Sequence, residues 1–243
     1  MTFELYQIPL LILVCAGAGF VQRVSGFGLG IFAMLFLPYI MPSHTAAAAM
    51  VCLISGTTSG YNAIRYRKDA PYKTILPLLC AAFVMIPLAV RFGASVPEKL
   101  IKSLLGIVLI VLSVYFLFFD NKVHIKANTR SGLFAGALSG ILNALFSTGG
   151  PPAVLYMTHA AASNAAYFAG IQTYFACTNV YSSLVRLFHG ILTREIFFGA
   201  VIGAVGALAG DRIGRKLFDK LDGKRLKKII YIGMIVSGIF MIV

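Results

Sequence analysis

Arg23 is the first residue in this sequence whose chemistry differs sharply from its surroundings. It is the only charged residue between Glu4 and Arg65, and it lies two residues before the glycine-rich stretch SGFGLG at 25–30. An arginine inside an apolar segment costs about 2.5–3.5 kcal/mol on membrane-insertion scales, so such residues usually face a cavity or a partner. A guanidinium group suits a carboxylate or a small oxyanion. Arg23 therefore indicates an anion site, with snorkelling to an interface or capping of helix carbonyls as the alternative.

Glycine and proline clusters interrupt two apolar segments, and such breaks at membrane depth must be buried in protein or line a cavity. They are SGFGLG at 25–30 and STGGPP at 147–152. The first break would begin a new half-helix, whose positive end attracts anions. Pro151 and Pro152 suit the first turn of a returning half-helix, because proline needs no N–H partner there. The candidate substrate-binding residues are Gln22, Arg23, Ser25, Gly26, Gly28, Asn143, Ser147, Thr148, Gly149, Gly150, Gln172 and Asn179.

Apart from Arg23, these candidates are uncharged. Gln172 and Asn179 are seven residues apart and so share one helical face, where they line the same cavity or make a polar contact between helices. The glycines and prolines also suit close helix packing and a kink, so a purely structural interpretation stays open for each residue taken singly.

Charged residues recur at the ends of the apolar segments. Arg65, Arg186, Arg91 and Arg212 occupy such positions, and we expect them to anchor helices at the membrane interface. Attraction of substrate at the cavity mouths is the alternative. Asp211 is next to Arg212, and a structural ion pair is a simpler interpretation than a proton-coupling carboxylate.

The composition excludes an ordinary soluble domain. Of the 243 residues, 59% are hydrophobic and 12% are charged, and the mean hydropathy is +0.87. Soluble domains carry roughly twice that charged fraction. The net charge of +13 lies almost wholly in short loops, as the positive-inside rule predicts, so nucleic acid is not expected as a partner. We predict an all-α polytopic membrane protein in a lipid bilayer, with apolar segments at 8–41, 46–64, 74–92, 100–119, 131–160, 166–187, 195–211 and 228–243.

The sequence repeats itself at an offset of 121 residues. Gln22 then falls on Asn143, Arg65 on Arg186, and Arg91 on Arg212. Several glycines match in the same register. Gln22 and Asn143 are expected to face each other across a pseudo-twofold axis. We predict a first transmembrane repeat at 1–119, a basic connecting loop at 120–130 and a second transmembrane repeat at 131–243.

The loop charges predict how the two repeats are oriented. The loops 65–73, 120–130 and 211–228 are strongly basic, whereas their counterparts carry fewer basic residues. All three share the cytoplasmic face if each broken segment is a re-entrant or hairpin element followed by three transmembrane helices. Neither limb of a broken segment is expected to reach the ~20 residues of a full span. The prediction is two inverted repeats, with both termini on the non-cytoplasmic side.

The sequence gives little support to catalysis or to metal binding. Cys15, Cys52, Cys80 and Cys177 fall inside apolar segments and are expected to pack as small hydrophobic residues. The four histidines are scattered, and no HExxH motif, Ser/His pair or pair of carboxylates occurs at catalytic spacing. We therefore predict that the protein is not an enzyme and has no metal site and no cofactor.

The stretches around the two breaks resemble those of a known family. They are GAGFVQRVSGFGLG at 17–30 and GALSGILNALFSTGGPP at 136–152. With the two-fold repeat and the short basic loops, they resemble the sulfite exporter TauE/SafE family over essentially the whole chain. Members often have a fuller glycine run in the first motif, where this chain has Phe27 and Leu29. The resemblance implies a transporter of the bacterial inner membrane for sulfite or an organosulfonate.

Together these observations predict a secondary transporter of a small anion that works by alternating access. No nucleotide-binding motif occurs in the chain, so the energy would come from an ion or substrate gradient. An anion channel and a transporter of a small carboxylate are the alternatives. A homodimer is possible.

Overall fold

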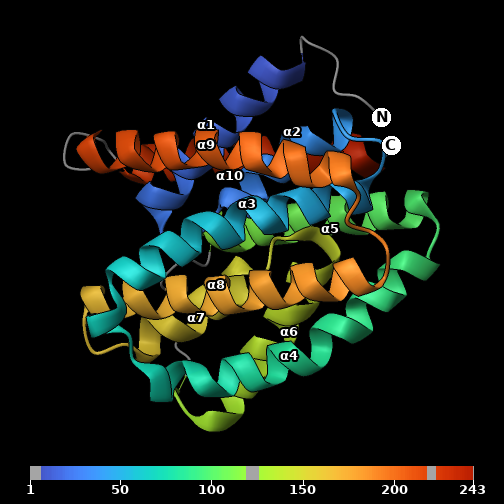
Figure 1. Cartoon of the computed structure of the whole chain (residues 1–243). Helices are drawn as coiled ribbons and strands as arrows, with labels where there is room; N and C mark the ends of the chain where they lie inside the picture. The colour runs from blue at the N-terminus through green and yellow to red at the C-terminus, as the bar shows by residue number, and fades with distance from the viewer. Residues whose placement is uncertain (1–6, 119–125, 218–222, 243) are drawn as a thin grey trace.

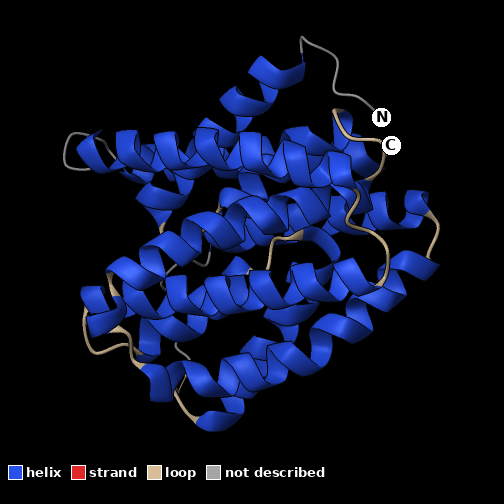
Figure 2. Cartoon of the chain, viewed as in Figure 1, coloured by secondary structure: helices blue, strands red, loops and turns tan. Residues whose placement is uncertain are grey.

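The computed structural model describes residues 7–118, 126–217 and 223–242. Within these ranges the chain consists of helices joined by short links and has no strand (Figure 2). The all-helical prediction is therefore confirmed for the described residues. Most of the predicted connector, residues 120–125, lies outside them.

The helices correspond one by one to the predicted apolar segments, with the two broken segments each giving two helices. The first half contains α1 (Gln7–Ser25), α2 (Leu29–Phe36), η1 (Leu37–Tyr39), α3 (His44–Arg65), η2 (Arg67–Asp69), α4 (Tyr72–Ser95) and α5 (Glu98–Phe118). The second half contains α6 (Thr129–Phe146), α7 (Gly150–Ala160), α8 (Asn164–Phe188), α9 (Arg194–Leu217) and α10 (Gly223–Ile242).

Both helix breaks fall where glycine clusters predict them. Gly26 and Gly28 have φ angles of 80° and 111°, and Ser147 has a φ of 54°, so the chain leaves the right-handed region at both breaks. The predicted limb lengths need a correction. The helices α1 and α6 have 19 and 18 residues, which is close to a full span of about 20, and only α2 and α7 are short.

The same local signal starts the helix that follows each broken element. The N–H of Ala46 donates to the Ser43 hydroxyl at the start of α3, at 3.1 Å. The N–H of Ala166 donates to the Ser163 hydroxyl at the start of α8, also at 3.1 Å. Serine N-caps of this kind stabilise a helix start by about 1 kcal/mol. The two halves therefore begin their first long helix in the same way.

The helices α3 and α8 pack against each other in the middle of the molecule (Figure 1). On one side α9 covers α3 and α1 covers α9, and on the other side α4 covers α8 and α6 covers α4. The helices α5 and α10 pack together. Each pairing has its counterpart when α1–α5 are exchanged for α6–α10, as a two-fold repeat requires.

The first broken element returns to the end of the molecule where it starts. Gln7, at the start of α1, and Met41, just after η1, line the same pocket. The start of α5 lies at this end too, because the His44 N–H donates to the Glu98 carboxylate at 3.3 Å.

Three of the described helices are long and apolar enough to cross a membrane, in the ranges Gln7–Val24, Tyr72–Ser95 and Arg194–Lys216. The central helices α3 and α8 are less apolar, because they bury polar residues such as Ser59, Asn62 and Gln172 inside the molecule. Polar side chains between helices are typical of functional membrane proteins.

We expect the packing of α6 against α4 to depend on glycine. A Cβ on Gly140 would lie 2.8 Å from the Cα of Ala82, whereas a Cβ on Gly60 in α3 would have no atom within 4 Å. Gly140→Ala should destabilise the protein by roughly 1–3 kcal/mol through overpacking. Gly60→Ala should leave stability unchanged or raise it by up to about 1 kcal/mol through helix propensity. The thermal unfolding midpoints of the two purified variants check this prediction. Equal midpoints would contradict the close packing of α6 against α4 at Gly140.

Candidate functional site

The two helix breaks contact each other near the middle of the molecule. Gly30, at the start of α2, packs against the Ser147 carbonyl so closely that any side chain there would collide with it. A Cβ on Gly150, at the start of α7, would lie 3.1 Å from the Phe27 ring. Glycine is thus required at position 30, and a larger residue at position 150 would need the Phe27 side chain to shift.

A small cavity of about 20 Å³ lies between the breaks. Such a volume holds about one water molecule, so the site is contracted in this conformation. Eight of the twelve predicted binding residues line it: Gln22, Gly28, Asn143, Ser147, Thr148, Gly149, Gly150 and Asn179. Leu29, Gly30, Ile31, Ser55 and Phe175 complete the lining.

Two helix N-termini open into this cavity. The first intrahelical bond of α2 runs from the Phe32 N–H to the Gly28 carbonyl at 2.8 Å, so the three preceding N–H groups have no acceptor within the helix. No side chain caps α2 at Gly28 or α7 at Gly149. Pro151 and Pro152 lie in the first turn of α7, as the sequence predicts. Uncapped helix starts attract anions through their dipole and their free N–H groups, and among the first three residues of α7 Gly150 alone has an N–H, because the other two are prolines.

Two cavity side chains have polar atoms without partners. The Asn143 Nδ2 and the Thr148 Oγ1 are buried, and neither has a hydrogen-bond partner in the described structure. A buried polar atom left unpaired costs about 1–3 kcal/mol, so each such atom needs an explanation. Both atoms are able to donate a hydrogen bond to a bound oxyanion.

Gln22 and Gln172 hold the first break in place. The Gln22 amide donates to the Gln172 side-chain oxygen at 3.2 Å and to the Ser59 hydroxyl at 3.1 Å. The Gln172 amide donates to the Gly26 carbonyl at 3.0 Å. Gln22 and Asn143 line the same cavity, but the hydrogen-bonded amide partner of Gln22 is Gln172. Gln172 and Gly26 therefore support the cavity without lining it.

Asn179 joins α3 to α8 beside the cavity. Its amide donates to the Ser55 hydroxyl at 3.2 Å, and the Cys52 thiol donates to its side-chain oxygen at 3.2 Å. Cys52 thus makes a polar contact in addition to packing as a small residue.

Arg23 is absent from the lining of the cavity. Its guanidinium carbon lies 5.0 Å from the centre of the Phe168 ring, and its side chain packs against Gly214 of α9. Burial raises the pKa of the nearby Tyr66 hydroxyl, but the positive charges of Arg23 and Arg215 outweigh that effect and lower it. Arg23 therefore lies in a cationic cluster at the end of α3. The side chain of Ser25, the remaining candidate, is outside the described part of the structure.

The predicted ion pair of Asp211 has a different partner. Asp211 is buried and binds Arg215 at 3.0 Å, while Arg212 is exposed. The spacing explains this, because residues four apart on a helix are neighbours and adjacent residues point in different directions.

Arg186 is the residue whose position the sequence did not predict. The interpretation as an interfacial anchor is wrong for it, because its side chain is only 2% exposed. Its guanidinium donates to the backbone carbonyls of Ala48 in α3 and Ala144 in α6. The sequence held one signal that Arg186 is buried, namely that few charged residues lie near it along the chain. Arg65 is followed by further basic residues at 67, 68 and 73, whereas the next charged residue after Arg186 is Arg194.

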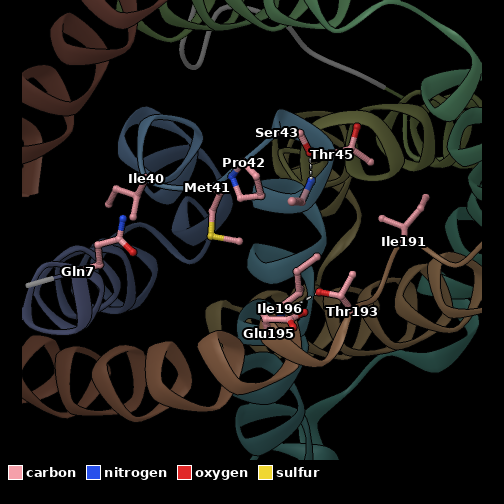
Figure 3. Close-up of a pocket in the computed structure, with 11 residues that line it drawn as sticks. Gln7, Ile40, Met41, Pro42, Ser43, Thr45, Ile191, Thr193, Glu195 and Ile196 are labelled. Atoms are coloured by element: carbon pink, nitrogen blue, oxygen red, sulfur yellow. Dashed lines mark hydrogen bonds between the residues drawn. The ribbon is translucent and has the colours of Figure 1, made fainter. Parts of the chain in front are cut away.

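A larger pocket of about 410 Å³ opens at the end where α1 starts (Figure 3). Its lining is mainly apolar and includes Gln7, Met41, Thr45 and Ile191. Among the described residues, Glu195 is its only charged lining residue, and a carboxylate would repel an anion. Despite its size, this pocket is a poorer anion site than the contracted cavity.

The chain matches a known protein family. Residues 11–241 match the family described as Sulfite exporter TauE/SafE. No curated protein and no solved structure matches the chain. Proteins of the family are membrane transporters of sulfite- or sulfonate-type anions rather than enzymes, which fits the apolar helices and the small anion partner expected here. Since the match covers nearly the whole chain, this protein belongs to the sulfite exporter TauE/SafE family.

Proposed function

We propose that this protein is a secondary transporter that carries sulfite or an organosulfonate across the inner membrane by alternating access. The observation that carries the proposal is the cavity between the two breaks. Two uncapped helix starts and two unpartnered donors, Asn143 Nδ2 and Thr148 Oγ1, converge on it. A sulfo group has three oxygens and a negative charge, and such a set of donors suits it.

The proposal includes an inverted arrangement of the two repeats, 1–119 and 131–243. Since α3 starts beside the start of α1, α4 starts at the opposite end. A Cβ on Gly132, near the start of α6, would lie 3.1 Å from Pro77 in the first turns of α4. These contacts support a second half that begins at the end opposite to the first. Both termini would then lie on the non-cytoplasmic side.

A carrier explains the contracted cavity better than an open channel does. The space between the breaks holds about one water molecule, so an anion enters only when the two broken elements move apart. Alternating access needs such an occluded conformation, with the site near the interface of the repeats. We propose that the 410 Å³ pocket is the vestibule on the non-cytoplasmic side.

We also propose that Arg23 attracts anions at the cytoplasmic mouth instead of binding them in the cavity. It lies beside Tyr66, where the basic loop 65–73 begins. One of its guanidinium nitrogens, Nη1, has no hydrogen-bond partner among the described residues.

Thr148→Val tests the cavity. The substitution keeps the shape of the side chain but removes the unpartnered hydroxyl, and a hydrogen bond to a charged ligand contributes about 1.5–3 kcal/mol. Uptake of labelled sulfite or methanesulfonate into proteoliposomes should show a KM raised about 10-fold or more. Thr57→Val is the matched control, because Thr57 is exposed and bonds only to the Leu53 carbonyl of its own helix.

Equal KM values for Thr148→Val and Thr57→Val would remove the cavity from the substrate path. Trans-stimulated exchange is expected of a carrier, and single-channel currents without such exchange would favour the channel.

Arg23→Gln should weaken uptake mildly and in a salt-dependent way. Arg23 is half-buried, and a partly exposed charge contributes up to about 1 kcal/mol, so KM from the cytoplasmic side should rise roughly 2- to 5-fold at low salt. The difference should shrink at high salt as screening increases. Arg91→Gln, at the exposed end of α4, is the control. Loss of uptake at every salt concentration would instead place Arg23 in the binding site.

A further inference from the structure

Arg186 is a buried cation without an acidic partner. Its side chain is among the largest fully buried ones, and no carboxylate in the described residues lies within ion-pairing distance of it. An unpaired charge in a low-dielectric interior is expensive, and residues of this kind in membrane proteins usually serve function. Its positive charge therefore requires an explanation beyond packing.

The guanidinium lies next to the wall of the cavity between the breaks. Arg186 Nη1 is 3.3 Å from the Ala48 carbonyl oxygen, and the Ser147 hydroxyl donates to the same oxygen at 2.6 Å. Because both atoms are bonded to one oxygen, they are at most about 6 Å apart. Ser147 lines the cavity. Arg186 is thus separated from the proposed anion site by one side chain and one carbonyl.

Arg186 also lies close to the 410 Å³ pocket proposed as the vestibule. It lines a small cavity of about 10 Å³ together with Thr45, Ala144 and Ile191. Thr45 and Ile191 also line the 410 Å³ pocket. The cation therefore lies between the vestibule and the cavity of the breaks.

Capping of α6 accounts for the hydrogen bonds of Arg186 but not for its charge. Ala144 is in the last turn of α6, where a cation is favourable beside the negative end of the helix dipole. A neutral amide side chain would satisfy the same two carbonyls without placing a full charge in the interior. The residues that line the cavity are all uncharged, so the local site carries one net positive charge.

We propose that Arg186 is the fixed counter-charge of the transported anion and makes the site selective for monoanions such as sulfonates and bisulfite over dianions such as sulfate. The inference rests on the proposed function and adds the charge of the substrate to it. A monoanion beside Arg186 gives a neutral complex. A dianion leaves one negative charge uncompensated in a medium of low dielectric constant, where such a charge is costly.

The first test uses the purified wild-type protein and its thermal unfolding in the presence of methanesulfonate or sulfate. Ligands that bind the folded state raise the unfolding temperature in proportion to their affinity and concentration. Methanesulfonate should bind at least about 30-fold more tightly than sulfate. Sulfite should bind more tightly as the pH falls through its second ionisation, near neutrality, while methanesulfonate binding should stay unchanged. Sulfate binding as tight as that of methanesulfonate would overturn the proposal.

The second test uses Arg186→Gln, Arg186→Lys and the matched control Arg65→Gln, which alters the exposed counterpart of Arg186 at the 121-residue offset. Arg186→Gln should lose about 30-fold or more in methanesulfonate affinity. Arg186→Lys should keep the monoanion preference, because it keeps the charge. Arg65→Gln should behave as the wild type does.

A purely structural cap would lower the unfolding temperature of the ligand-free Arg186→Gln protein but leave its anion affinities unchanged, and that result would overturn the proposal. If Arg186→Gln is not recovered folded, the Arg186→Lys protein tests the proposal instead. Loss of the monoanion preference in Arg186→Lys, which keeps the positive charge, would contradict the proposed role of that charge. A wild type that takes up sulfite without charge preference would remove only this inference. A wild type that neither binds nor moves sulfite and methanesulfonate would remove the proposed function as well.

Discussion

The structure depends on one constraint, namely that backbone groups freed inside a membrane need partners within the protein. Each half of the chain breaks a helix, and the two breaks meet. The Ser147 hydroxyl bonds to the Ala48 carbonyl, and the Ser139 hydroxyl bonds to the Gly149 carbonyl. Gly30 lets the two backbones approach, and Gly150 leaves room for the Phe27 side chain. Asn143 Nδ2 and Thr148 Oγ1, which remain without partners among the described residues, belong to side chains that line the cavity between the breaks.

The other helices hold this contact in position. The central pair α3 and α8 brings Ser59 and Gln172 to Gln22, and Gln172 reaches on to the Gly26 carbonyl. The first break is thus held by side chains from both halves. A fully connected polar network of this kind specifies one arrangement, because every broken bond inside it leaves a buried group unpaired. Rigid support of this kind is what a binding site for a small ligand requires.

The sequence predicted the helices and the two breaks, because glycine, proline and hydropathy act locally and leave a readable pattern. It predicted most of the cavity lining for the same reason, since the lining follows the breaks. It did not predict the directions of single side chains. Gln22 and Arg23 are adjacent, yet Gln22 bonds to the buried Gln172, whereas Arg23 lies against Phe168 and Gly214, because neighbours on a helix point about 100° apart. Arg186 was missed because its burial depends on the packing of α3 and α6 around it.

The two arginines also explain an asymmetry of the repeat. At the 121-residue offset Arg23 falls on Ala144, so the second broken element has no arginine of its own. Arg186 of α8 donates to the carbonyl of that same Ala144 and so brings a cation to the second break from another helix. One positive charge then lies near the cavity and one near the mouth at Tyr66. Transport needs a site that attracts its ion but also releases it. In the proposal above, the single charge of Arg186 attracts the anion, and the neutral donors beside it add no second charge that would slow its release.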